Sequence, residues 1–93
     1  MSQSTKTPLF QPLDHASRTS ARVADAIRRV IVGGQLQPGE TLPPERALAQ
    51  RFQVTRNTVR EALRTLEQLR LVSIRQGSGI RVRDYLTSAG LEL

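Results

Sequence analysis

The hydrophobic positions between residues 16 and 32 recur at intervals of three and four residues, with polar residues between them. The positions that follow this period are Val23, Ile27, Val30 and Ile31. Their spacing predicts a helix over about residues 16–32 that buries one face. Gly33 and Gly34 predict its end, because glycine readily adopts the left-handed conformation that closes a helix.

Two shorter helices are predicted next, with a tight connection between them. After a short extended piece at residues 41–42, Pro43-Pro44 is expected to open a helix that ends near Phe52, since proline is tolerated in a first helical turn. Thr55 suits the N-cap of the following helix, predicted over about residues 55–69. The apolar positions of this third helix are Val59, Ala62, Leu63, Leu66 and Leu69.

The pattern changes to alternation of apolar and polar residues after residue 70. Val72, Ile74, Ile80 and Val82 alternate with polar residues on either side of Gly77-Ser78-Gly79. This arrangement predicts two half-buried strands joined at a glycine-rich tip. Two short helices joined by a tight turn form a helix-turn-helix, and a hairpin beside them forms a wing. The predicted fold is therefore mainly α with a small β wing, a winged helix-turn-helix of three helices plus a β-hairpin.

The chain divides into three parts by pattern. Residues 1–14 show no helical or strand period and are expected to form a flexible tail. Residues 15–83 form the predicted winged helix-turn-helix domain, and residues 84–93 are a short acidic end. Length fits this division, since 93 residues suit one small domain.

Composition excludes several classes of site. The chain has no cysteine and one histidine, so neither a disulfide framework nor a metal site built from cysteines or several histidines is available. Asp14, His15 and Ser17 crowd the predicted start of the first helix, where a polar or capping role is expected. We therefore expect no enzyme activity, no metal and no cofactor. No apolar run is long enough for a membrane span, which predicts a cytoplasmic protein.

Charge gives the first indication of a partner. The formal net charge is +6, and thirteen of the fourteen cations are arginine. The excess is concentrated in residues 44–83, which hold nine cations and three anions. Such a basic segment favours a polyanion as partner. A basic surface that only keeps the protein soluble is the alternative reading of charge taken alone.

The start of the predicted third helix carries side chains suited to base recognition. Arg56, Asn57 and Arg60 lie in its first turn and a half, and Arg46 lies on the helix before it. In a helix-turn-helix this region faces base edges in the major groove, where arginine pairs with guanine and asparagine with adenine. The alternative is a solvated arginine stripe with Glu61 and Glu67 as local partners. Placement directly after a tight turn favours DNA.

The hairpin tip is the second basic feature. Its residues 76–79 begin with Gln76 and Gly77, and Arg75, Arg81 and Arg83 flank them. A slim basic tip with glycine suits entry into the minor groove. The alternative is a plain hairpin whose charged edges prevent aggregation.

Residues 42–82, LPPERALAQRFQVTRNTVREALRTLEQLRLVSIRQGSGIRV, resemble the DNA-binding domain of GntR-family bacterial transcription regulators, and residues 22–41 continue the match. TVREAL followed by GSG is most similar to the FadR-like subgroup. The resemblance implies sequence-specific binding of double-stranded, palindromic operator DNA by a homodimer. It implies DNA contacts for Arg46, Thr55, Arg56, Thr58 and Arg60, and a wing tip in the minor groove at Gly77. Gln76 stands where a relative uses histidine, and Asn57 stands at a variable position.

The chain departs from the family pattern at the helix ends. Pro44 and Ala47 replace the serine and glutamate of a capping box, which predicts a second helix without a side-chain N-cap. Gln53 and Arg70 each replace a glycine, which predicts an unfavourable left-handed backbone at both.

The resemblance also implies a second, C-terminal domain that binds a small-molecule effector and dimerises. Residues 84–93 resemble the linker toward such a domain, which this chain lacks. Whether the regulator is a repressor or an activator depends on the geometry of the promoter. Two other functions are weighed against DNA binding. A protein–protein module would carry mixed or apolar residues on the third helix and wing, and a double-stranded RNA has too narrow a major groove to admit the helix.

Overall fold

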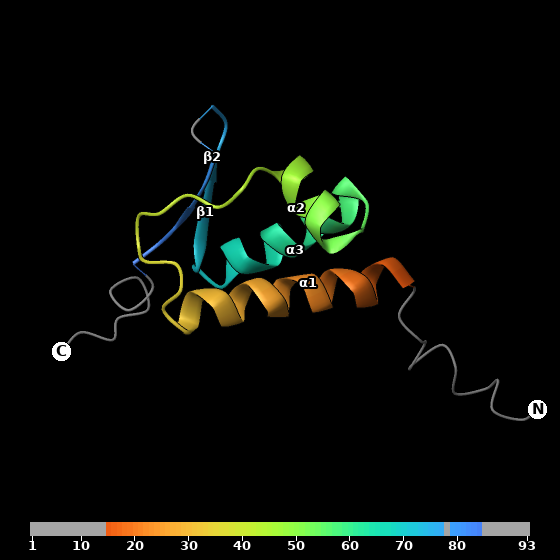
Figure 1. Cartoon of the computed structure of the whole chain (residues 1–93), viewed down its shortest axis with the longest axis horizontal. Coiled ribbons are helices and arrows are strands. Elements are labelled where there is room, and N and C mark those ends of the chain that lie inside the picture. Colours follow the sequence, from red (N-terminus) through yellow and green to blue (C-terminus); the bar gives the residue numbers. More distant parts are fainter. Residues whose placement is uncertain (1–14, 78, 85–93) are drawn as a thin grey trace, which may run out of the picture.

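The computed structural model describes residues 15–77 and 79–84, with side chains described from residue 18 onward. The elements in chain order are α1 (His15–Val32), α2 (Glu45–Phe52), α3 (Arg56–Gln68), β1 (Val72–Arg75) and β2 (Gly79–Val82). The predicted winged helix-turn-helix of three helices and a hairpin is thereby confirmed (Figure 1). Within this part of the chain, no helix combines the length and the apolar character that a membrane span requires.

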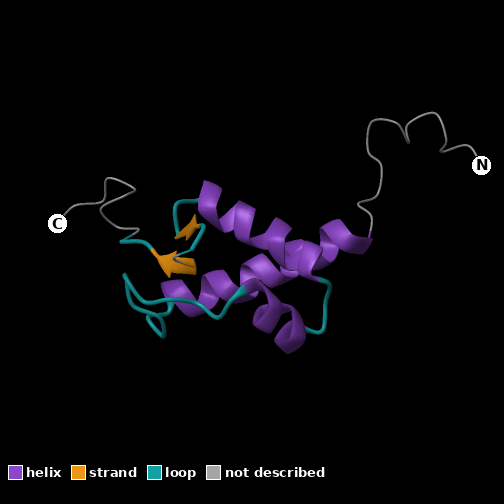
Figure 2. Cartoon of the chain, turned by 90° about the horizontal axis from the view of Figure 1, so that it is seen from above, coloured by secondary structure: helices purple, strands orange, loops and turns teal. Residues whose placement is uncertain are grey.

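The helix α3 lies at the centre of the domain and packs against α1, α2 and β1. α1 runs along one side of α3, while α2 lies beside the start of α3 and the hairpin beside its end (Figures 1 and 2). α1 packs against α3 through its predicted apolar face, on which Val23, Ile27 and Ile31 are buried. Glycine is required directly after α1 for a steric reason, because a Cβ on Gly33 would lie 2.8 Å from the carbonyl oxygen of Arg29.

The turn between α2 and α3 has a left-handed residue that is not glycine. Gln53 has φ 58°, and the N–H groups of Gln53 and Val54 donate to the carbonyls of Gln50 and Ala49. This pair of bonds is the Schellman motif that closes many helices. α3 ends in the same way at Arg70, with φ 63°. Both predicted left-handed positions are confirmed, and a non-glycine residue there costs about 1 kcal/mol.

The other end of α2 is closed less well. Pro44 occupies the N-cap position and makes no side-chain capping hydrogen bond, as the missing capping box predicted. The helix itself begins at Glu45, so the prolines precede it rather than forming its first turn. α2 therefore depends on packing, and Leu48 and Ala49 are its buried residues.

The hairpin gains a third backbone segment from the chain before α2. β1 and β2 pair antiparallel with Val72 opposite Val82 and Ile74 opposite Ile80. Thr41 forms an isolated bridge with Arg81, and the Leu42 N–H donates to the carbonyl of Ile80 at 2.8 Å. The predicted extended piece at residues 41–42 thus ties the start of α2 to the wing.

Two residues expected in the core are exposed. Leu69 is 56% exposed because it is the C-cap of α3, where the helix ends and the chain turns away. Ile74 is 39% exposed, whereas Ile80 opposite it on β2 is buried, although both residues border the same open groove. The core is otherwise continuous through all three helices and the hairpin: Val23, Ala24, Ile27, Ile31, Leu42, Leu48, Ala49, Val59, Ala62, Leu63, Leu66, Leu71, Val72, Ile80 and Val82.

Candidate nucleic-acid interface

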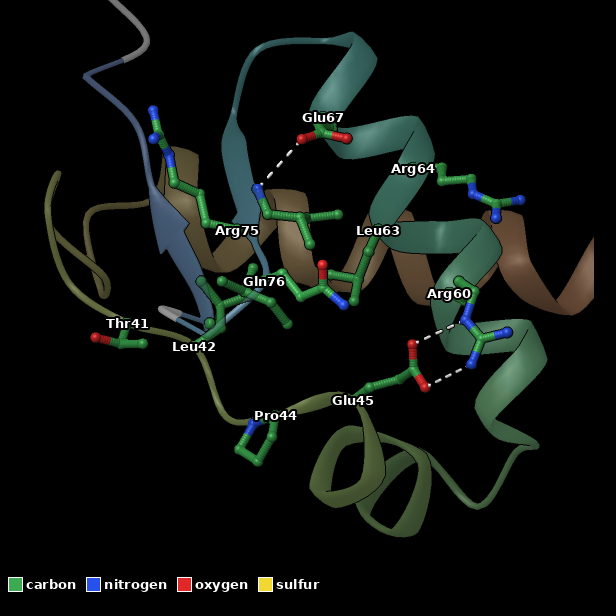
Figure 3. Close-up of a pocket in the computed structure, with 13 residues that line it drawn as sticks. Thr41, Leu42, Pro44, Glu45, Arg60, Leu63, Arg64, Glu67, Arg75 and Gln76 are labelled. Carbon is green, nitrogen blue, oxygen red and sulfur yellow. Dashed lines mark hydrogen bonds and ion pairs between the residues drawn. The ribbon is translucent and has the colours of Figure 1, made fainter.

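An open groove of about 610 Å³ lies between α3, the start of α2 and the hairpin (Figure 3). We call it the α3–wing groove. Its floor is largely apolar and its rim carries charged side chains. It is lined by Thr41, Leu42, Pro44, Glu45, Arg60, Leu63, Arg64, Glu67, Ile74, Arg75, Gln76, Gly79 and Ile80.

Thr55 and Thr58 order the first turn of α3. The Thr55 hydroxyl accepts a hydrogen bond from the Thr58 backbone N–H at 3.1 Å, which makes Thr55 the N-cap. The two hydroxyl oxygens lie 2.9 Å apart, and Thr58 is 7% exposed. Thr55 is exposed, as a contacting residue must be. The Thr58 side chain instead faces inward and supports the cap.

Arg56 and Arg60 converge on one carboxylate, that of Glu45. Arg60 Nε and Nη2 donate to Glu45 Oε2 and Oε1 at 3.1 and 3.0 Å, and Arg56 Nε donates to Oε1 at 3.4 Å. The side chains of Arg56 and Arg60 are 63% and 49% exposed, whereas that of Glu45 is 22% exposed. The three residues thus form a charged cluster, of which Glu45 and Arg60 line the groove, and the carboxylate is less exposed than the two arginine side chains.

The electrostatics of this cluster are reciprocal. The hydrogen bonds from Arg60 are the main cause that holds the pKa of Glu45 below its usual range, with Arg56 adding to the effect. Glu45 in turn raises the pKa of Arg60, chiefly through the same hydrogen bonds. Both shifts favour the charged forms of Glu45 and Arg60.

Glu45 was not identified from the sequence. It lies 11 positions before Arg56 and 15 before Arg60, so no helical spacing rule connects them. Only the fold of the two helices across the Gln53 turn brings the carboxylate to the arginines. The pairing could have been anticipated only from the helix-turn-helix fold itself, which places the first turn of α2 beside the start of α3.

The acidic residues of α3 have separate roles. Glu61 pairs with Arg64 at 3.4 Å, as the solvated-stripe alternative predicted for one of its three arginines. Glu67 instead accepts a hydrogen bond from the Ile74 backbone N–H at 3.2 Å, which fixes the hairpin to α3. Arg46 and Asn57 are both exposed. Neither lines the α3–wing groove.

The hairpin presents its tip beside the groove. Gln76 extends into the groove toward α3, and the Arg75 guanidinium is turned away from α3 (Figure 3). Gly77 has φ 86°, a conformation that favours glycine, and a Cβ there would meet open space. Arg81 Nη1 donates to the Gly39 carbonyl at 3.3 Å, so Arg81 braces the turn before α2. Ser78, within the predicted tip at 76–79, lies outside the described residues.

Residues 19–82 match the family described as bacterial regulatory proteins, gntR family. The chain belongs to the GntR family. The chain is 45% identical over 79 residues to an HTH-type transcriptional regulator of Mycobacterium tuberculosis, a match that covers 85% of this chain and 32% of that protein. It is 48% identical over 69 residues to the Uxu operon transcriptional regulator of Escherichia coli, covering 74% of this chain and 27% of the regulator.

A solved structure has the same fold. The DNA-binding domain of AraR, crystallised in complex with the operator ORR3, is 34% identical to this GntR domain with a TM-score of 0.67. The match covers 69% of this chain and 77% of the AraR chain. The family assignment predicted from residues 22–82 is confirmed, whereas membership of the FadR-like subgroup stays a prediction. The matched segments cover about a third or less of the curated relatives.

Proposed function

We propose that this chain is the DNA-binding domain of a bacterial transcription regulator and binds double-stranded operator DNA in a sequence-specific way. In the complex, α3 enters the major groove and the wing tip at residues 76–79 approaches the minor groove. The observation that carries the proposal is the capped start of α3, where Arg56, Asn57 and Arg60 are exposed together.

Each of these side chains has a contact that its chemistry favours. Arg56 and Arg60 pair with guanine or phosphate, and Asn57 pairs with adenine. Thr55 donates its hydroxyl to a phosphate, and the N-terminus of α3 adds a partial positive charge that attracts the same group. Thr58 contributes by supporting the cap, since its own side chain is buried.

Contacts outside α3 set the orientation on the duplex. Arg46 is an exposed residue in the first turn of α2, and α2 crosses the DNA backbone in a helix-turn-helix complex. Arg46 therefore binds phosphate. At the wing, Gly77 lets the backbone approach the minor groove closely, and Gln76 supplies an amide that both donates and accepts hydrogen bonds.

The comparisons support this function. The AraR domain of the same fold was crystallised with operator DNA, and the relatives are transcriptional regulators. The matched segments make up 32% and 27% of these relatives, which are therefore about three to four times as long. For the whole protein we propose a homodimer in the cytoplasm on a palindromic operator. We also propose that residues 84–93 lead from the domain at 15–83 to a C-terminal domain that binds a small-molecule effector.

Selection of bound duplexes from a random DNA pool tests the function. The expected result is enrichment of one half-site motif of a few base pairs. Titrations should then show tighter binding to the selected duplex than to a scrambled one. The salt dependence of binding to either duplex should be steep, with a log–log slope of about −0.9 per neutralised phosphate. Equal binding to the selected and scrambled duplexes would rule out sequence-specific recognition, and binding that is insensitive to salt would rule out contact with phosphates.

A further inference from the structure

Glu45 is an acidic residue on the face that is proposed to meet a polyanion. It is the first residue of α2, and its carboxylate accepts three hydrogen bonds from the two arginines proposed to recognise DNA. Repulsion of phosphate by this carboxylate lowers affinity for any duplex. A carboxylate at this position would lower the affinity for DNA of any sequence, and this cost is explained if Glu45 also improves the distinction between one DNA sequence and another.

The geometry of the Arg60 pair leaves the recognition edge of the guanidinium group available. Arginine has five N–H donors, and Glu45 engages Nε and one hydrogen of Nη2 (Figure 3). The hydrogens on Nη1 and the second hydrogen on Nη2 stay open. These neighbouring donors form the end of the guanidinium that pairs with O6 and N7 of guanine. Glu45 thus fixes the side chain of Arg60 without blocking a two-point contact with a base.

Fixing a long side chain affects specific and non-specific binding differently. A base contact requires one orientation of the guanidinium, and a side chain already held there loses less rotamer entropy on binding. A phosphate contact tolerates many orientations, so it gains little from the same restraint. The charge of Glu45 also neutralises part of the cluster, which weakens contacts to phosphates of any sequence.

We propose that Glu45 is a positioning residue that raises the sequence specificity of this domain by holding Arg60, and secondarily Arg56, in the orientation for base contact. The proposal rests on the DNA-binding function proposed above. Glu45 restrains the two guanidinium groups and opposes their use as general phosphate ligands.

The test compares wild type, Glu45→Gln and Glu61→Gln. Glu61 provides the control, because it is also a glutamate paired with an arginine of α3, at 3.4 Å from Arg64, although its side chain is 59% exposed against 22% for Glu45. Both variants remove one negative charge that is paired with an arginine of α3. Dissociation constants are measured for the selected duplex and for a scrambled duplex over a series of salt concentrations, after circular dichroism has verified folding.

Glu45→Gln is expected to bind the scrambled duplex about threefold to tenfold more tightly, with a salt slope steeper by about one phosphate. Its affinity for the selected duplex should stay the same or fall, so that the ratio of the two dissociation constants decreases. Glu61→Gln should change both affinities by one common factor. Combining Glu45→Gln with Arg60→Ala should abolish most of the effect of Glu45→Gln on the ratio.

Glu45→Asp keeps the negative charge at the start of α2 but shortens the side chain. It is expected to lower the ratio while leaving the salt slope near that of wild type, and it decides the matter if Glu45→Gln fails to fold. An unchanged ratio in both variants, or equal losses on both duplexes, would overturn the proposal. A variant could also lose affinity only for the selected duplex, with no loss once a single base pair of that duplex is changed. That result would overturn the proposal and indicate that Glu45 itself contacts this base pair.

Failure of the function itself has a different signature. A wild-type domain that does not distinguish the two duplexes overturns both proposals together. A wild-type domain that does distinguish them, beside a Glu45→Gln variant with the same ratio, overturns only the role of Glu45.

Discussion

The hydroxyl of Thr55 accepts the backbone N–H of Thr58 at 3.1 Å, and the two hydroxyl oxygens lie 2.9 Å apart. This local pair closes the first turn of α3, and Arg56, Asn57 and Arg60 lie within the first turn and a half of the same helix. A change in the cap is therefore expected to affect both the stability of the helix start and the presentation of the proposed contacts. The two threonines nevertheless differ in exposure, and this difference separates their predicted roles.

Replacement of Thr55 by alanine should lower the free energy of unfolding by about 1 kcal/mol, because one N–H at the start of α3 loses its acceptor. Urea denaturation measures the change. Thr65→Ala is the control, since Thr65 is also exposed on α3 but its hydroxyl donates to the Glu61 carbonyl within the helix. An equal loss of unfolding free energy in Thr55→Ala and Thr65→Ala would show that the N-cap hydrogen bond makes no particular contribution to stability.

Replacement of Thr58 by valine should leave the choice of DNA sequence unchanged. Valine has nearly the shape of threonine, so the buried site stays filled, and the backbone N–H of residue 58 still donates to Thr55. A modest loss of stability is expected from the missing hydroxyl. The ratio of dissociation constants for the selected and scrambled duplexes is the measurement. If the variant folds normally but this ratio falls, Thr58 contacts the DNA directly.

Replacement of Gln53 or Arg70 by glycine should stabilise the domain by about 0.5–1 kcal/mol each, because both residues have positive φ, which glycine adopts without strain. Thermal and urea unfolding measure the gain. The control is Gln50→Gly inside α2, where glycine should cost about 1 kcal/mol. Stabilisation by neither glycine would show that other interactions of the two side chains offset the strain.

The sequence predicted the elements because their periods and end signals are local. The period of Val23, Ile27 and Ile31 defined α1, and Thr55 marked the start of α3. Burial was predicted less well at Leu69 and Ile74, since it depends on which neighbour covers a residue after folding. The cluster of Glu45 with the two arginines could not be predicted from spacing, because it exists only through the packing of α2 against α3.

The ion pairs of Glu45 should make stability dependent on acid pH. The folded pKa of Glu45 is lowered, chiefly by Arg60, so its contribution is present above the unfolded pKa of about 4.3 and is lost as pH falls through the lower folded value. The difference in unfolding free energy between wild type and Glu45→Gln should therefore shrink below about pH 4.3.

Asp25 needs a separate control in this experiment, because Arg28 and Arg29 lower its pKa as well. Asp25→Asn should reduce the acid dependence that remains in the Glu45→Gln variant. A difference between wild type and Glu45→Gln that stays constant from neutral pH to about pH 3 would show that the ion pairs do not stabilise the fold.

Replacement of Arg56 or Arg60 by alanine should weaken binding to the selected duplex by about 1–3 kcal/mol, and binding to the scrambled duplex by much less. The reason is that a lost base contact affects one sequence, whereas a lost phosphate contact affects all sequences equally. Arg51→Ala is the charge-matched control, since Arg51 borders a different pocket with Ala26 and Ile27 of α1. Equal losses on both duplexes would show that Arg56 and Arg60 serve only as phosphate ligands. The sequence preference would then have to come from the remaining exposed candidates, Asn57 on α3 and Gln76 at the wing.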